Sequence, residues 1–131
     1  MKPYYPEVLS RLGLESGNLL EIGSGEGEFL VFASQNSDLK LKGYDVHEHA
    51  GRDEQRDNRV KSKLQDAGLD EDTYVWISNR DPVPFEDRSI DVVVSLQTLE
   101  HVEDLDHLFS EVSRLLAPGG LALTIFLLRK C

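Results

Sequence analysis

Short apolar runs along this chain predict the strands of a β-sheet. Ile90–Leu96 is a nearly continuous apolar run, which is typical of a strand covered on both faces in a parallel sheet. Leu19–Ile22 is a shorter apolar run, and Thr73–Ser78 is rich in β-branched and aromatic residues. Two further strands are expected at Leu39–Val46 and at Leu121–Leu128.

The stretches between these runs predict helices that connect parallel strands. A helix is expected to begin near Glu26–Phe29, and another to span Leu105–Leu116 before a break at Ala117–Gly120. Glu54–Ala67 reads as a solvated crossover helix with a few apolar residues spaced to face the sheet, and a mobile cover over a ligand is the less favoured alternative. Strands that alternate with helices predict an α/β fold, with one open and mainly parallel sheet between helices.

A glycine turn follows the first strand. Gly23, Gly25 and Gly27 lack the Cβ atoms that hold a ligand away from the main chain, and they permit positive φ. A strand, a glycine turn and a helix start together form the place where an open parallel sheet binds a small molecule. Such turns also occur for purely structural reasons, so the turn alone does not decide the function.

The spacing of this turn disfavours a dinucleotide. The dinucleotide fingerprint is Gly-x-Gly-x-x-Gly, but here the third glycine comes one residue early and Glu28 occupies the last glycine position. Glu26 and Glu28 lie in the first helical turn, and Glu21 adds a further negative charge near the ligand, so a phosphate would be repelled. A cationic, phosphate-free ligand fits better. Asp45 ends the second strand about twenty residues beyond the turn, where this architecture places a carboxylate that accepts hydrogen bonds from ribose hydroxyls.

Four blocks of residues resemble the class I (Rossmann-like) S-adenosylmethionine-dependent methyltransferases, of the type 11-like kind. The blocks are Leu20–Gly27, Gly43–Val46, Val83–Val94 and Leu99–Gly120, and they stand in the order and spacing of that family. The resemblance covers roughly residues 15–128. It implies a three-layer Rossmann-like fold, a single domain over residues 1–131 and S-adenosyl-L-methionine as the cofactor.

The resemblance also implies a set of cofactor-binding residues. It assigns the glycine turn to the methionine part of the cofactor, Asp45 to the ribose and the loop after the third strand to the adenine. Asn79 can serve in that loop because its side chain offers both a donor and an acceptor, whereas Arg80 replaces a small residue and would contact the base through its backbone. Leu96 and Gln97 would border the methyl group and the incoming acceptor. The full set is Glu21, Gly23, Ser24, Gly25, Gly27, Asp45, Val46, Asn79, Arg80, Leu96 and Gln97.

The sequence assigns no catalytic residue. Methyl transfer from a sulfonium is an in-line displacement that depends mainly on positioning, and it needs a general base only if the acceptor must lose a proton. His101 is the weak candidate for that base, and a role as a hydrogen-bonding anchor before a helix is favoured. His47 and His49 could approach the adenosine edge, but a solvated position is favoured. No His, Cys and carboxylate spacing suggests a metal site.

Composition restricts the partners. The formal net charge of -10 argues against DNA or RNA, because binding a phosphate backbone usually draws on a basic surface. No apolar run approaches a membrane span, and the single cysteine, Cys131, favours a reducing, cytoplasmic location. The acidic run Glu100–Asp106 is expected at a helix start, with Asp104 or Asp106 as its cap, rather than at an acceptor-binding surface.

The expected fifth strand has no successor in the sequence. The resembling family continues with a helix and an antiparallel hairpin, so Leu121–Leu128 is expected to be a free edge of a truncated domain. A long apolar edge promotes association, which predicts self-association or a partner chain through this strand, unless the chain is a fragment of a longer enzyme.

Three functions remain open. The favoured one is a methyltransferase, or its cofactor-binding core, that acts on an unidentified small-molecule or glycan-like acceptor. The second is a non-catalytic module that binds the cofactor or docks to a partner. The third and least favoured is a nicotinamide-dependent oxidoreductase.

Overall fold

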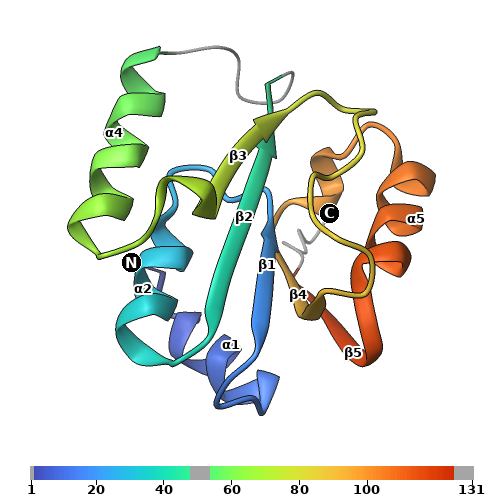
Figure 1. Cartoon of the computed structure of the whole chain (residues 1–131), viewed down its shortest axis with the longest axis horizontal. Helices are drawn as coiled ribbons and strands as arrows, with labels where there is room; N and C mark the ends of the chain where they lie inside the picture. The colour runs from blue at the N-terminus through green and yellow to red at the C-terminus, as the bar shows by residue number, and fades with distance from the viewer. Residues whose placement is uncertain (1, 48–53, 126–131) are drawn as a thin grey trace, which may run out of the picture.

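Five parallel strands form the middle layer of the structure, a computed structural model that describes residues 2–47 and 54–125 (Figure 1). The strands are β1 (Asn18–Ile22), β2 (Lys40–Val46), β3 (Tyr74–Ile77), β4 (Ile90–Leu96) and β5 (Leu116–Ile125). Their order in the sheet is β3-β2-β1-β4-β5, and every neighbouring pair is parallel. The predicted open, parallel sheet is therefore confirmed, with β1 at its centre.

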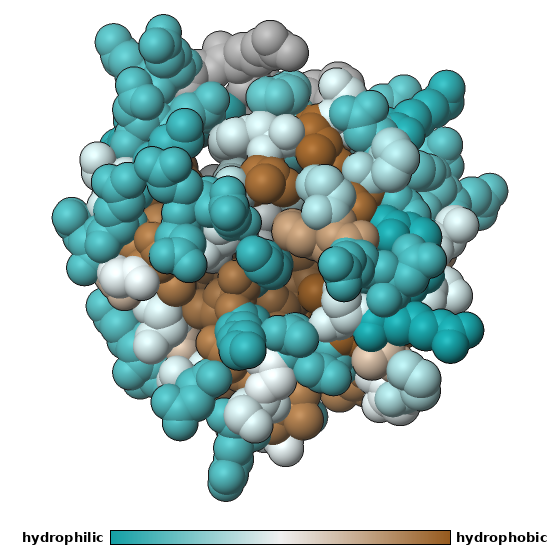
Figure 2. Space-filling model, in the orientation of Figure 1, coloured by the Kyte–Doolittle hydropathy of each residue, from teal (hydrophilic) through white to brown (hydrophobic). Residues whose placement is uncertain are grey.

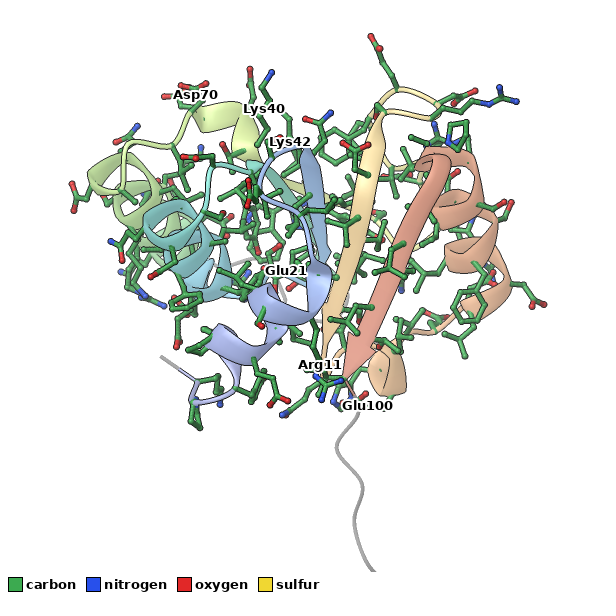
Figure 3. All side chains as sticks on the ribbon, turned by 90° about the horizontal axis from the view of Figure 1, so that it is seen from below. Arg11, Glu21, Lys40, Lys42, Asp70 and Glu100 are labelled. Carbon is green, nitrogen blue, oxygen red and sulfur yellow. The ribbon has the colours of Figure 1, made fainter. Side chains whose placement is uncertain are left out.

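Helices cover both faces of this sheet. Figure 3 shows α1, α2 and α4 on one side of the strands and α5 on the other, so the predicted three layers are present. The helical elements are α1 (Tyr5–Leu12), α2 (Glu28–Asn36), α4 (Glu54–Asp66), α5 (Leu105–Leu115) and the 3-10 turns η1 (Glu71–Thr73) and η2 (Leu99–His101). Asp104 caps α5 by accepting a hydrogen bond from the His107 backbone N–H at 3.0 Å, as expected for the acidic run.

Two apolar cores follow from the alternation of side chains along the strands. Leu19, Val92 and Val94 belong to the core under α1, α2 and α4, whereas Leu20 and Val93 belong to the core under α5. In Figure 2, apolar residues show through at the centre of the viewed face and hydrophilic side chains cover its periphery.

Helix α1 was not predicted from the sequence. It begins with Pro6 in its first turn, buries Tyr5, Val8 and Leu12, and carries an exposed Glu7–Arg11 ion pair at 3.0 Å. Pro at a helix start and an i, i+4 ion pair are recognisable signals, but the helix is only eight residues long.

The fifth strand begins earlier than predicted. Leu116 already pairs with Ile90, and an irregularity follows before Leu121 pairs with Val92. The residues between, which include Gly119 at φ 79°, therefore lie within β5, and the predicted break at Ala117–Gly120 is wrong. The last three residues predicted for this strand lie outside the described residues.

Candidate functional site

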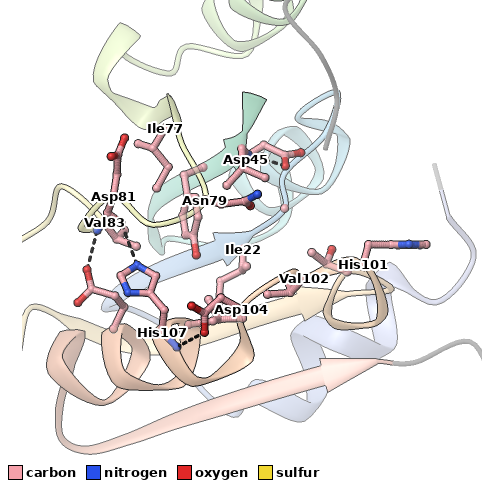
Figure 4. Close-up of a pocket in the computed structure, with 16 residues that line it drawn as sticks. Ile22, Asp45, Ile77, Asn79, Asp81, Val83, His101, Val102, Asp104 and His107 are labelled. Carbon is pink, nitrogen blue, oxygen red and sulfur yellow. Dashed lines mark hydrogen bonds between the residues drawn. The ribbon is translucent and has the colours of Figure 1, made fainter. Parts of the chain in front are cut away.

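A crevice lies at the carboxyl ends of β1, β2 and β4, where the helix after β1 (α2) and the helix after β4 (α5) pack on opposite faces of the sheet. This point, at which strand order reverses, is where open α/β sheets bind ligands. The crevice has two lobes that share Gly23, Asp45 and Thr98. We call the lobe between the sheet and α5 the inner lobe and the lobe facing α4 the outer lobe. The inner lobe is drawn in Figure 4, and its other walls are Ile22, Tyr44, Val46, Ile77, Asn79, Asp81, Val83, His101, Val102, Asp104, His107, Leu108 and Glu111. The outer lobe is completed by Gly25, Glu26, Arg56, Trp76, Leu96 and Gln97.

The peptide of Gly25 is the best-fixed part of the glycine turn. Its N–H donates to Asp45 Oδ2 at 3.0 Å, and its carbonyl accepts a hydrogen bond from Tyr74 Oη at 2.7 Å. Gly25 has a φ of 52°, and a Cβ built on it would meet no other atom within 4 Å. The turn therefore presents bare backbone to the outer lobe, as glycine allows.

Gly23 and Ser24 fasten the start of the turn to β2. Both backbone N–H groups donate to the Tyr44 carbonyl, at 2.9 and 3.0 Å. A Cβ on Gly23 would collide with the Thr98 side chain, so glycine is required where η2 approaches the turn. Ser24 is buried, and its hydroxyl donates to the Glu21 carbonyl at 3.1 Å. Ser24 lines neither lobe, so it would contribute to cofactor binding indirectly, by holding the turn in shape.

Gly27 does not line the crevice either. It has a φ of 76° at the start of α2, and a Cβ there would touch Val60 and Leu64 of α4 at 3.5 and 3.4 Å. These are ordinary van der Waals distances, so the positive φ at the start of α2, rather than lack of space, favours glycine here, and a cofactor contact at Gly27 stays a prediction. Nearby Glu26 binds Arg59 of α4 at 3.0 Å, and this hydrogen bond lowers the pKa of Glu26.

The Glu21 carboxyl also lies away from both lobes. Leu20 and Ile22 face the α5 side of the sheet, so the alternation of the strand turns Glu21 toward the opposite face, near α1 (Figure 3). Its side chain is buried, and burial raises the pKa of Glu21 from 4.5 to about 8. The raised pKa counts against a negative charge at this position, and a cofactor contact at Glu21 stays a prediction.

Asp45 joins the two lobes. The residue is 5% exposed, and its Oδ1 accepts a hydrogen bond from the Val46 backbone N–H at 2.8 Å while Oδ2 accepts one from Gly25. Two backbone donors fix the carboxylate at the rim between the lobes, where each oxygen retains a further lone pair. Val46 lines the inner lobe beside it.

Asn79 lines the inner lobe and Arg80 does not. The Asn79 amide donates to Glu103 Oε2 at 2.6 Å, so a residue just before α5 orients the amide. Arg80 is exposed, and its guanidinium lies 3.5 Å from Asp104. The structure thus separates the pair that the resemblance grouped together.

Leu96 and Gln97 line the outer lobe, at the end of β4. Gln97 has a φ of 56°, and its N–H donates to the Ile125 carbonyl of β5 at 2.7 Å. Non-glycine residues held in this left-handed region cluster at binding and active sites, because the surrounding structure must enforce them.

The histidines occupy different positions. His101 is exposed and lines the inner lobe, with its ring pointing away from Asp104 and His107 (Figure 4). His47 lines neither lobe but stacks on Trp76, with ring centroids 5.7 Å apart, so a merely solvated position for it is wrong. His49 lies outside the described residues.

Carboxylates dominate the charge of the crevice. The described lining residues include Glu26, Asp45, Asp81, Asp104 and Glu111, against one guanidinium, that of Arg56, and two imidazoles. Glu26, Asp104 and Glu111 each pair with an arginine outside the lining, at 3.0, 3.5 and 2.7 Å, so Asp45 and Asp81 carry most of the bias against a pyrophosphate. Within residues 2–47 and 54–125, no group of three or more His, Cys, Asp or Glu residues is arranged to hold a metal ion.

The sequence interpretation missed most of the lining residues of the two lobes, among them Thr98, Arg56 and Trp76. Thr98 borders both lobes, and Arg56 lies over the Trp76 ring at 4.5 Å from its centroid in the outer lobe. The position of Thr98 just after β4 was a usable signal, because strand ends at this edge meet. Nothing in the sequence indicated that Arg56 of the polar crossover helix would reach Trp76 of β3.

Comparison with known proteins identifies the fold and the family. A family model described as a methyltransferase domain matches residues 1–130. The chain belongs to the methyltransferase domain family. It is 32% identical over 119 residues to 27-O-demethylrifamycin SV methyltransferase of Amycolatopsis mediterranei, and 31% identical over 103 residues to 24-methylenesterol C-methyltransferase 2 of Oryza sativa. These alignments cover 89% and 79% of this chain but only 42% and 27% of the two relatives.

Solved structures agree with this assignment. A putative S-adenosyl-L-methionine-dependent methyltransferase from Methanococcus maripaludis superposes with a TM-score of 0.72 at 25% identity, over 93% of this chain and 54% of that one. A geranyl diphosphate methyltransferase solved with its substrate and sinefungin superposes with a TM-score of 0.70 at 23% identity, over 92% and 43%. The predicted methyltransferase family and its cofactor, S-adenosyl-L-methionine, are confirmed. The alternative prediction of a nicotinamide-dependent oxidoreductase gains no support from these comparisons. The methyltransferase domain described here spans about half or less of these relatives.

Proposed function

We propose that this chain forms the cofactor-binding core of a methyltransferase that acts on a small-molecule or glycan-like acceptor. The observation that carries the proposal is the Gly25 peptide, which is fixed by Asp45 and Tyr74 and is bare toward the outer lobe. A backbone surface next to a ribose-binding carboxylate is what an adenosyl-sulfonium ligand requires.

The residues present fit S-adenosyl-L-methionine. The inner lobe has apolar walls and the Asn79 amide, which suit an adenine ring. Asp45 at the junction can accept hydrogen bonds from the ribose hydroxyls, and the turn at Gly23 and Gly25 leaves room for the methionine part. The excess of carboxylates in the lining favours a ligand that carries a sulfonium and an ammonium group. This fit extends the family's cofactor to named residues of this chain.

Catalysis by this core would consist mainly of positioning. The cofactor supplies a methyl group already activated by its bond to a positively charged sulfur. Leu96, Gln97 and Thr98 border the outer lobe and would hold the acceptor in line with that bond, at the near-attack distance on which such a displacement depends. His101 remains the weak candidate for a general base; its ring points away from Asp104 and His107, and a role as a hydrogen-bonding anchor before the helix stays the favoured prediction.

The acceptor class is inferred from the relatives. Two of them are named for a rifamycin and a sterol substrate, and a structural neighbour was solved with geranyl diphosphate. A small organic acceptor is the common feature, whereas the acidic chain offers little to a nucleic acid. A cytoplasmic location stays a prediction from the cysteine content. Within the described ranges, no helix is long and apolar enough to cross a membrane.

The second candidate function is a non-catalytic module that docks to a partner. Strand β5 pairs only with β4 in the described part of the chain, and Leu121 on it is 48% exposed. An uncovered edge strand can pair with another strand, so we propose self-association or a partner chain at β5. Sedimentation that shows a monomer at all micromolar concentrations would remove the self-association.

The test of the main proposal combines binding and turnover. Calorimetry should show binding of S-adenosyl-L-methionine and S-adenosylhomocysteine and none of NAD. Formation of S-adenosylhomocysteine in the presence of candidate acceptors would establish transfer, whereas binding without product across acceptor classes would favour the docking module. Absence of binding to either sulfur compound would refute the main proposal.

A further inference from the structure

A row of side chains on α5 fastens the wall of the inner lobe. The segment between β3 and β4 has no regular secondary structure, and its residues Asn79, Asp81 and Val83 form one side of that lobe. Four contacts join it to α5 or to the residues just before α5. They are Asn79 to Glu103 at 2.6 Å, Arg80 to Asp104 at 3.5 Å, the Asp81 carbonyl to His107 Nε2 at 3.0 Å, and the Val83 N–H to Glu111 Oε1 at 2.7 Å.

Glu111 is the most buried of the four helix-side partners. It is 8% exposed, and both of its oxygens are engaged, because Arg114 donates to Oε2 at 2.7 Å and to Oε1 at 3.2 Å. The hydrogen bond from Arg114 is the main cause of a lowered pKa for Glu111, so the carboxylate is ionised at neutral pH. Arg114 in turn donates to the carbonyls of Val83 at 2.8 Å and Phe85 at 3.0 Å.

This arrangement makes α5 responsible for the shape of the wall. Val83 is buried and lines the inner lobe, and its backbone N–H and carbonyl are both held from α5, by Glu111 and Arg114. A buried backbone N–H that loses its acceptor is destabilising, so the segment would move to recover a partner. Asn79, four residues earlier on the same wall, would move with it.

We infer that Glu111 is a positioning residue that sets the selectivity of the inner lobe for adenine. This inference rests on the proposed function, which places the base of the cofactor in that lobe. Glu111 acts through Val83 and the wall rather than on the base, because its oxygens are already occupied. The wall presents Asn79, whose NH₂ group donates to Glu103, and the acceptor that this amide can offer to a base is its carbonyl oxygen. A carbonyl acceptor matches the 6-amino group of adenine and opposes the 6-oxo group of hypoxanthine.

The test compares S-adenosylhomocysteine with S-inosylhomocysteine by calorimetry. Glu111→Gln keeps an oxygen that can accept from Val83, and Glu111→Ala removes it. We expect the wild type to prefer the adenosyl ligand by at least about tenfold, Glu111→Gln to keep most of that ratio, and Glu111→Ala to lower it at least about fivefold. Glu7→Ala is the control, because Glu7 is also a helix carboxylate that binds an arginine, but it is exposed and lines neither lobe. This variant should leave the ratio unchanged.

A merely structural role would weaken both ligands equally. An unchanged ratio in Glu111→Ala, within twofold of the wild type, would therefore overturn the inference. If that variant does not fold, Glu111→Asp replaces it, since a side chain one methylene shorter withdraws the acceptor from Val83, and the same criterion applies. Hydrogen exchange of the Val83 amide tests the positioning without any ligand: protection that survives in Glu111→Ala would overturn the inference. Failure of the wild type to bind either ligand would instead overturn the proposed function.

Discussion

For Gly25→Ala the structure predicts a small loss of folding stability and a larger loss of cofactor affinity. Gly25 has a φ of 52°, and an added Cβ would meet no protein atom within 4 Å. The free energy of unfolding should therefore fall only by the cost of holding a side chain in the left-handed region, about 1–2 kcal/mol. Gly68 offers a matched control, because its φ is 80° and a Cβ there also meets nothing within 4 Å, but it does not line the crevice.

The two substitutions should differ in ligand binding. The Cβ of Gly25→Ala occupies space in the outer lobe, against which the methionine part of the cofactor is expected to lie. Forcing an extra carbon into a filled contact costs about 1–3 kcal/mol, which corresponds to a loss of affinity of roughly 5- to 150-fold. Gly68→Ala should have the same stability loss and an unchanged affinity.

Urea unfolding and calorimetry with S-adenosylhomocysteine measure the two effects in the same preparations. The reasoning predicts equal stability losses and a large affinity loss in Gly25→Ala alone. If Gly25→Ala binds within threefold of the wild type while Gly68→Ala is destabilised as expected, the cofactor does not contact the Gly25 peptide and the assignment of the turn is refuted.

Three further predictions follow from individual side chains. Asp45→Asn should weaken S-adenosylhomocysteine binding about 10- to 100-fold in calorimetry, because a charge-assisted hydrogen bond is worth about 1.5–3 kcal/mol. Asp91→Asn, at the opposite end of the sheet, should leave the affinity unchanged. Equal affinities of the two variants would contradict the ribose assignment. Glu21→Gln should gain stability relative to the wild type as the pH rises from 5 to 8, measured by urea unfolding. The Glu21 pKa is raised from 4.5 to about 8 by folding, so the wild type binds a proton on folding and loses stability as the pH rises through that window. A constant difference between the two proteins would show that Glu21 is ionised when folded. Gly43→Ala should lower the free energy of unfolding by about 1–3 kcal/mol, because its Cβ would overlap Ser24 Oγ, and an unchanged midpoint would contradict the close approach of the turn to β2.

The glycine turn and the acid at the end of β2 could be predicted because both depend on local sequence. A strand that ends in Gly-x-Gly and a second strand that ends in Asp place their ends at the same edge of a parallel sheet. The structure brings Gly25 and Asp45 into a hydrogen bond at 3.0 Å, in agreement with that expectation. The four predicted strand positions β1 to β4 were also recovered, because buried parallel strands have distinctive apolar runs.

Side-chain direction and packing between distant elements could not be predicted in the same way. The alternation of β1 already implied that Glu21 faces opposite to Leu20 and Ile22, but which face borders the crevice depends on where the helices pack. Gly27 was grouped with its neighbours by spacing, although it lines neither lobe and lies beside Val60 and Leu64 of α4. Contacts of this kind join residues more than thirty positions apart, and no local pattern encodes them.

The contacts of Arg114 show the same limit on the other face. Its guanidinium binds Val83, Phe85 and Asp87 across a segment without regular structure, and these bonds fix a wall of the inner lobe. The sequence marked Val83–Val94 as a family block but did not say that α5 holds it.

A crystal structure of this chain with S-adenosylhomocysteine tests the central claim most directly. The account predicts the adenine in the inner lobe near Asn79, the ribose hydroxyls on Asp45 and the sulfur beside the Gly23 and Gly25 peptides. A crevice without ligand at saturating concentration, or a ligand bound at another surface, would contradict it.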